Sequence, residues 1–330
     1  MSQPKPLTPT ADARPPFFVG VDLGATAIVA GLFDDAGCPL ARSILAERPD
    51  HRSEGAADQT ARAVAEALRK AGLEPSAIAR LGVSAPASRE DGPAIAAGVN
   101  RRCGLPVTFA DSIDAAAYGE FWIGAGRGFH SLVLLNLDTH IDCGIIVDRL
   151  SLDDQHRRGA ECGHLLIDSL PTARLCCCGQ RGHFNAYGSV TAVIERAREA
   201  VEAGRASLLR TNLDGGQPLS LELLREAADG GDPLALEIIA ETARSVAVGI
   251  TSLLHTVDPS GVLLAGPLTF GGSPTALGRR FLGWVREEIA HRAFPLLAER
   301  TVIDFAVLGE DARHTGAAGL ARKHSLSDVA

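Results

Sequence analysis

The chain has 330 residues, of which 46% are apolar and 22% charged, a balance that indicates a folded globular protein and excludes disordered, collagen-like and coiled-coil chains. This length exceeds one ordinary core, so we expect two lobes, and no apolar run is long enough to cross a membrane. The 32 Lys and Arg residues against 40 Asp and Glu residues give a net charge of -8, which disfavours nucleic acid and anionic membranes as partners.

Residues 1–16 form a polar, proline-rich segment without a secretion signal. We interpret this segment as a flexible tail of a cytoplasmic protein. The chain has seven cysteines, three of them consecutive at Cys176, Cys177 and Cys178. Because a reducing compartment disfavours disulfides, we expect thiols that bind a metal rather than a disulfide framework.

Apolar runs typical of buried strands alternate with amphipathic runs along the rest of the chain. Strands are predicted at 17–21, 27–33, 80–85, 105–109, 130–137, 144–149, 261–265 and 302–307. Helices are predicted at 55–71, 112–120, 189–209, 220–230, 233–257, 278–290 and 316–323. This alternation in two blocks predicts the α/β class.

The turn after the first strand has the composition of a phosphate site. It reads Asp22-Leu23-Gly24-Ala25-Thr26, in which small residues let backbone N–H groups approach phosphate oxygens. Thr26 adds a hydroxyl, and Asp22 is suited to hydrated magnesium. An ordinary hairpin also uses Asp and Gly at its turn, so this segment alone leaves both interpretations open.

Four later segments make the pattern specific, at 105–120, 159–164, 176–187 and 231–235. In this order, after Asp-x-Gly-x-Thr, they resemble the ROK family (repressor, open reading frame, kinase), which includes bacterial glucokinases, N-acetylglucosamine kinases and N-acetylmannosamine kinases. The resemblance implies the two-lobed actin-like ATPase fold of the ribonuclease H-like, hexokinase type. It places the N-terminal lobe at 17–120, completed by the helix near 316–323, and the C-terminal lobe at 121–315.

The resemblance also locates the catalytic base of the family, and here the chain departs from the pattern. Sugar-phosphorylating members have Asn-Asp where this chain has Asp111 and Ser112, and that Asp takes the proton from the sugar hydroxyl. The hydroxyl of Ser112 does not ionise near pH 7, and the sequence offers it no obvious base partner. Asp111 can replace the base only if the loop is re-registered. The simpler alternative is that both residues cap the following helix.

For the nucleotide phosphates, the resemblance implies Asp22, Gly24, Thr26, Thr139 and Gly266. Kinases of the family have Gly-Thr-Gly-x-Gly-Gly-Gly where residues 138–144 read Asp-Thr-His-Ile-Asp-Cys-Gly, and Gly-Gly where proline follows Gly266. A carboxylate 4 Å from a phosphate charge is repelled by about 1 kcal/mol in water and about 4 kcal/mol at an effective dielectric constant near 20. We therefore expect MgATP to bind poorly or not at all.

A structural zinc and a sugar site are implied as well. The zinc ligands of the family match His164, Cys176, Cys178 and His183, in a loop at 164–183. The residues that contact sugar hydroxyls match Asp111, Ser112, Glu161, His164 and Asn185, the last in place of a Glu. The alternatives are a loop of reduced cysteines without metal, and a Glu161 and His164 that only hold the zinc loop.

These features predict a ROK-family sugar-kinase-like protein that binds a hexose or N-acetylhexosamine in the interlobe cleft, with phosphotransfer weak or lost. One alternative is an active ATP-dependent hexose 6-kinase with Asp111 as its base. Another is a ligand-sensing regulator that acts through a protein partner. Residues 1–16 are too short for the winged helix of the family's repressors, so we expect no DNA binding in cis, and the resemblance implies a homodimer.

Overall fold

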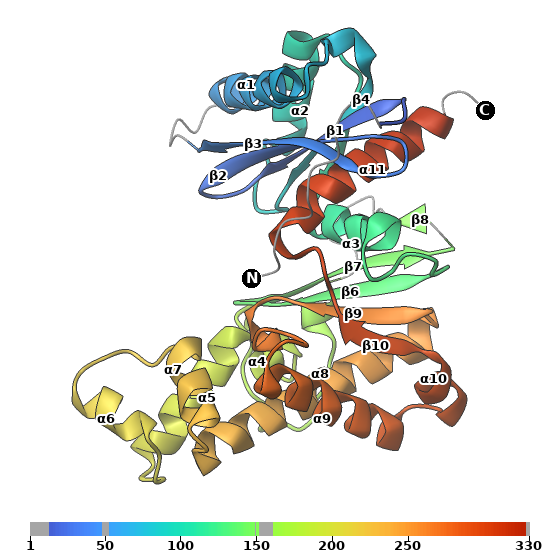
Figure 1. The fold of residues 1–330 in the computed structure, drawn as a ribbon. Coiled ribbons are helices and arrows are strands. Elements are labelled where there is room, and N and C mark those ends of the chain that lie inside the picture. Colours follow the sequence, from blue (N-terminus) through green and yellow to red (C-terminus); the bar gives the residue numbers. More distant parts are fainter. Residues whose placement is uncertain (1–12, 48–52, 149, 152–160, 328–330) are drawn as a thin grey trace. The chain divides into compact units, whose positions relative to one another are not determined.

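The computed structural model describes residues 13–47, 53–148, 150–151 and 161–327 (Figure 1). Contacts within the chain divide it into two compact units, which we call unit 1 and unit 2. Unit 1 comprises Met1–Phe129, Gly144–Gly159 and Ala306–Ala330, and unit 2 comprises His130–Cys143 and Ala160–Phe305. Among the described residues, no helix is long and apolar enough to cross a membrane.

Unit 1 is built on a five-stranded sheet in the order β3-β2-β1-β4-β5. The three strands β1, β2 and β3 are antiparallel, whereas β4 runs parallel to both β1 and β5. The strands are β1 (Phe17–Leu23), β2 (Ala27–Phe33), β3 (Pro39–Ala46), β4 (Ile78–Ala85) and β5 (Val107–Asp111). The helical segments are α1 (Ser53–Ala71), η2 (Pro75–Ala77), α2 (Gly92–Cys103), α3 (Ser112–Ile123), η5 (Gly309–Asp311) and α11 (Ala312–Ser327).

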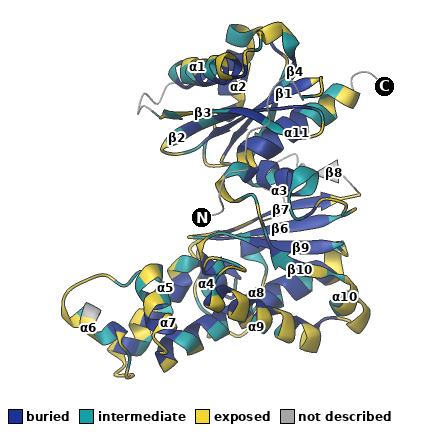
Figure 2. Cartoon of the chain, viewed as in Figure 1, coloured by how far each residue is buried: buried dark blue, intermediate teal, exposed yellow. Residues whose placement is uncertain are grey.

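Both faces of this sheet are covered, because α1 and α2 lie on one side and α11 with α3 on the other (Figure 1). Every residue of β1 is buried, as expected for a central strand between two helical layers (Figure 2). The helix α11 lies directly on the strands because they carry glycine where it crosses. A Cβ at Gly20 would lie 1.8 Å from the carbonyl oxygen of His314, and a Cβ at Gly82 would lie 1.9 Å from that of Ala317.

The second sheet has the order β10-β9-β6-β7-β8, in which β9 runs parallel to both β6 and β10. Its strands are β6 (Leu132–Leu137), β7 (Ile141–Val147), β8 (Leu150–Ser151), β9 (Gly261–Ala265) and β10 (Val302–Phe305). The long helices α8 and α9 pack against each other beside it (Figure 1). The helical segments of unit 2 are η3 (Cys162–His164), α4 (Asn185–Gly188), α5 (Val190–Glu202), α6 (Leu209–Asp214), α7 (Leu221–Asp229), α8 (Pro233–Val257), η4 (Pro267–Thr269), α9 (Ala276–Arg292) and α10 (Pro295–Arg300).

The predicted α/β class is confirmed, but several elements were not anticipated. The helix α2 was missed because an internal glycine lowers its helix propensity, and in the structure a Cβ at Gly98 would lie 2.7 Å from the Cβ of Ala57 on α1. The helix predicted at 189–209 ends at Glu202, since Gly204 follows with φ 90°. The segment at 138–143, expected to separate two strands, already enters β7 at Ile141.

Candidate functional site

In unit 1, polar side chains gather at the carboxyl ends of the parallel strands, the usual ligand-binding edge of an α/β sheet. Asp22 lies near the end of β1 and is paired in register with Ser84 of β4. The strand β5 ends at Asp111, and Ser112 begins α3. Arg313 comes from the first turn of α11. Residues of β1, β4, α3 and α11 therefore supply one polar cluster in unit 1.

Asp22 is the centre of this cluster. Its Oδ1 accepts hydrogen bonds from the hydroxyls of Ser84, at 3.1 Å, and Ser112, at 3.3 Å. Its Oδ2 lies 3.9 Å from Nη1 of Arg313. Asp22 is 7% exposed, and this burial raises the pKa of its carboxyl group. The charge of Arg313 and the two hydroxyls partly oppose the rise. The structure therefore gives the Ser112 hydroxyl a carboxylate hydrogen-bond partner that the sequence did not indicate.

Asp111 and the phosphate-type turn take structural positions. The Oδ1 of Asp111 accepts a hydrogen bond from the N–H of Ile113 at 3.1 Å, so the residue is the N-cap of α3, as one of the two interpretations anticipated. Gly24 donates its N–H to the carbonyl of Ala27 at 3.0 Å and closes the β1–β2 hairpin. Thr26 is exposed at the tip of this turn.

In unit 2, His164, Cys176, Cys178 and His183 have ligand atoms that all lie within 4.8 Å of one another. Two thiols and two imidazoles are the donor set of a closed tetrahedral zinc site. The loop brings them together through a tight turn in which Gly179 donates its N–H to the carbonyl of Cys176 at 2.9 Å. The predicted juxtaposition of these four residues is confirmed, and they form a possible metal-binding cluster.

The residues expected at the sugar hydroxyls fall on both units. In unit 2, the carboxylate of Glu161 lies 3.2 Å from Nδ1 of His164, which leaves Nε2 as the nitrogen available to a metal. Asn185, at the start of α4, is buried, and its Oδ1 accepts a hydrogen bond from the N–H of Ile141 at 2.7 Å. Its amide N–H groups remain as donors. Asp111 and Ser112 belong to unit 1.

One pair of cysteines departs from the expectation of metal-binding thiols rather than disulfides. Cys143 of β7 and Cys162 of η3 form a disulfide with a Cα–Cα distance of 6.0 Å. They are 19 residues apart in the sequence, and no spacing motif predicts their pairing. The other five cysteines are free, and the expectation of a metal-binding set is met by Cys176 and Cys178. Cys177 is exposed beside them.

The segment at 138–143 borders a pocket of about 530 Å³ within unit 2. The carboxylate of Asp138 accepts the N–H of Thr139 at 2.7 Å. Gly266 has φ 91°, and a Cβ there would lie 2.6 Å from the carbonyl oxygen of Leu137. The polar residues of the pocket wall include Thr139, His140, Arg174, Asn185, Glu195 and Glu199.

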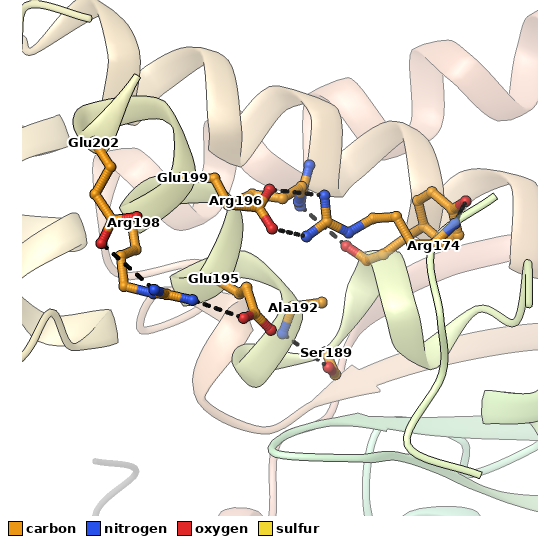
Figure 3. A network of polar contacts seen from close by, with 9 residues as sticks. Arg174, Ser189, Ala192, Glu195, Arg196, Arg198, Glu199 and Glu202 are labelled. Carbon is orange, nitrogen blue, oxygen red and sulfur yellow. Dashed lines mark hydrogen bonds and ion pairs between the residues drawn. The ribbon is translucent and has the colours of Figure 1, made fainter. Parts of the chain in front are cut away.

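Figure 3 shows how the charges of this pocket wall are paired. The guanidinium of Arg174 faces Glu199 with contacts of 3.0 and 2.7 Å. Arg198 lies between Glu195, at 2.8 Å, and Glu202, at 3.4 Å. The cations at this end of α5 are therefore already engaged by carboxylates. This pocket wall and the polar contacts of Ser84 and Arg313 were missed in the sequence, because each depends on tertiary contacts and no motif marks them.

The two sheets, the β1–β2 hairpin with Asp-x-Gly-x-Thr and the flanking helices define an α/β protein with the actin-like ATPase fold. The sequence profile of the ROK family matches residues 18–324, so the chain belongs to that family. It is 27% identical over 320 residues to a glucokinase of Thermotoga maritima, an alignment that covers 92% of this chain and 97% of the relative.

Solved structures agree with this assignment. The crystal structure of a ROK hexokinase from Thermus thermophilus has a TM-score of 0.77 and 27% identity, and the match covers 93% of this chain and 99% of that one. A ROK family glucokinase from Streptomyces griseus, solved in complex with glucose and AMPPNP, has a TM-score of 0.68 and 29% identity over the same shares of the two chains. The chain is accordingly a ROK-family, sugar-kinase-like protein.

Proposed function

We propose that the chain binds a hexose or an N-acetylhexosamine and that its phosphotransfer is weak or lost. The proposal rests mainly on the side chains of the two residues at the position of the family's base. Ser112 offers a hydroxyl in place of a carboxylate, and Asp111 is engaged as the N-cap of α3. General-base catalysis contributes about 10² to 10⁴ in rate, so its loss alone would leave little turnover.

The nucleotide side supports the same proposal. Asp138 and Asp142 stand where the family's kinases have glycine, and Asp142 is exposed on β7. The nearby pocket also has Glu195 and Glu199 in its wall, and the arginines that pair with them leave no free cation there among the described residues for a phosphate. Each carboxylate within about 4 Å of a phosphate charge would repel it by about 1 to 4 kcal/mol, depending on the local dielectric constant. A neutral polyol has no such penalty.

Zinc is the metal we propose for His164, Cys176, Cys178 and His183, in a structural role. Two thiolates and two imidazoles fit its softness and its tetrahedral geometry. The Glu161 carboxylate at Nδ1 of His164 would orient the ring for such an ion. The proposed sugar contacts are Glu161, His164 and Asn185 in unit 2 and Asp111 and Ser112 in unit 1.

A second candidate is an active hexose 6-kinase, and one contact favours it. Because the Ser112 hydroxyl donates to Asp22, a proton acceptor is available to the position of the base. The similarity to proteins named glucokinase and hexokinase points the same way. This candidate depends on Asp22 rather than on Asp111.

Thermal shifts of zinc-loaded protein separate the two candidates. A panel of hexoses and N-acetylhexosamines is measured with and without MgATP, and ADP formation is followed in parallel. A ligand at a hundred times its Kd stabilises the fold by about 2.7 kcal/mol, which is easily detected. We expect a shift with sugar, none with MgATP, and little ADP even after Ser112→Asp. Robust turnover would establish the kinase, and no shift with any sugar would refute both candidates.

A further inference from the structure

The disulfide between Cys143 and Cys162 lies inside the machinery proposed above. Each residue is 3% exposed, so the bond is part of the core of unit 2. Cys162 stands between Glu161 and His164, a proposed sugar contact and a member of the metal cluster. Cys143 follows the segment at 138–142 on β7. A change at this bond therefore acts on both segments.

Noncovalent contacts also join these segments, one directly and one through Asn185 of α4. The N–H of Ile141 donates to Asn185 at 2.7 Å. Gly163 packs so closely that a Cβ there would lie 2.4 Å from Nδ2 of Asn185 and 2.5 Å from the carbonyl oxygen of Ile141. The turn at 161–164 thus rests on β7 through one covalent bond and one tight backbone contact. Gly163 has no side chain that could add further contacts between the turn and β7.

We infer that Cys143 and Cys162 form a redox site whose oxidised state holds the turn at 161–164, with its metal ligand His164, against β7. The reductant is a dithiol. One of its thiolates attacks a sulfur of the pair, a mixed disulfide forms, and its second thiol displaces the remaining cysteine. Two electrons and two protons pass to the pair, which becomes two thiols, while the dithiol becomes a disulfide.

Reduction loosens the turn for a steric reason. Two thiols cannot approach to bonding distance, and both residues are buried in close packing, so we expect their separation to shift the turn at 161–164 away from β7. His164 moves with it. Because groups that orient a metal-bound histidine typically contribute 10- to 100-fold to metal affinity, we expect reduction to speed zinc release by about tenfold. This last step rests on the zinc site proposed above.

The test compares oxidised and reduced full-length protein. After denaturation with a chelator, the oxidised form should show five reactive thiols and the reduced form all seven. Amide hydrogen exchange of the peptide covering residues 161–166 should be about tenfold faster in the reduced protein. Zinc release to a chromogenic chelator is followed on the same samples, after the reductant has been removed without air.

Two double variants complete the design. Cys143→Ser with Cys162→Ser should reproduce the reduced state, and Cys38→Ser with Cys103→Ser, two free cysteines of unit 1, should leave exchange and zinc release redox-sensitive. Seven thiols in the oxidised protein would overturn the inference, and so would equal exchange at 161–166 in both states. Failure of the sugar proposal is seen separately, as an absent thermal shift with hexoses in an otherwise redox-sensitive protein. A protein without zinc would refute the zinc site and leave the exchange test in force.

Discussion

His314 on α11 should make the stability of this protein depend on pH. The residue is 3% exposed, and its Nδ1 has no hydrogen-bond partner among the residues that the structure describes. Its ring packs 5.9 Å from that of Phe33, and Nε2 lies 3.9 Å from the carboxylate of Asp311. Burial, with a smaller contribution from the charge of Arg42, lowers the pKa of His314 from 6.5 to about 3. The native state therefore holds this imidazole neutral.

The sign and size of the effect follow from this lowered pKa. Between pH 6.5 and pH 3 the unfolded chain binds a proton at this residue and the native chain does not, so stability falls as the pH falls. Each pH unit in that window contributes about 1.4 kcal/mol, so acidification to pH 5 should remove about 2 kcal/mol. The pKa of Asp311 is raised by burial, which acts in the opposite direction and is common to wild type and variant.

Urea unfolding at pH 7.5 and pH 5.0 measures the effect on wild type and on His314→Gln, which cannot be protonated. The variant is expected to be less stable at pH 7.5, because it repacks a buried site, but to lose about 2 kcal/mol less than wild type on acidification. His130→Gln, which changes an exposed histidine, should retain the wild-type loss. Equal losses in wild type and His314→Gln would refute the reasoning.

Three further predictions test the packing and the two clusters. Gly82→Ala should destabilise the fold by about 4 kcal/mol or more, because its Cβ would lie 1.9 Å from the backbone of α11. Gly283→Ala on α9, where nothing lies within 4 Å, should instead stabilise the fold by about 0.5 to 1 kcal/mol. Urea unfolding of both variants measures these changes. Arg313→Ala should raise the pKa of Asp22 further, because the guanidinium lowers it. Carboxyl ¹³C NMR titration measures this pKa, and an unchanged or lower pKa in the variant would contradict the prediction. Cys178→Ser should lose most bound zinc in metal analysis while Cys177→Ser, outside the cluster, keeps it; equal retention would remove Cys178 from the ligand set.

The sequence predicted the scaffold well where local signals agree with the tertiary fold. The strand Ala27–Phe33 and the helix Pro233–Val257 have the bounds that were predicted, because a tight turn and an N-cap followed by proline mark their ends. The strand β3 was missed because its sequence does not alternate regularly between apolar and polar residues. Its pairing with β2 stabilises it as a strand. Local propensity says little about such an edge strand.

The candidate site divides in the same way. The metal cluster was predictable because its ligands are close in the sequence and have a recognisable spacing. The partners of Asp22 were not, since Ser84 and Ser112 lie 62 and 90 residues away. The disulfide was not predictable because no spacing motif marks Cys143 and Cys162, and expectations about the compartment pointed against it. Contacts such as those of Asp22 form only when the chain folds, so no local sequence pattern predicts them.

A serine at the position proposed for the family's base would stabilise the fold. A carboxylate at this position would lie close to the buried Asp22 carboxylate, and two like charges 4 Å apart repel by about 4 kcal/mol at an effective dielectric constant near 20. Ser112 instead donates a hydrogen bond to Asp22. Catalytic sites often keep such unfavourable pairs because the reaction needs them. Under the proposed loss of phosphotransfer, the hydrogen bond of Ser112 to Asp22 would therefore favour stability over catalysis.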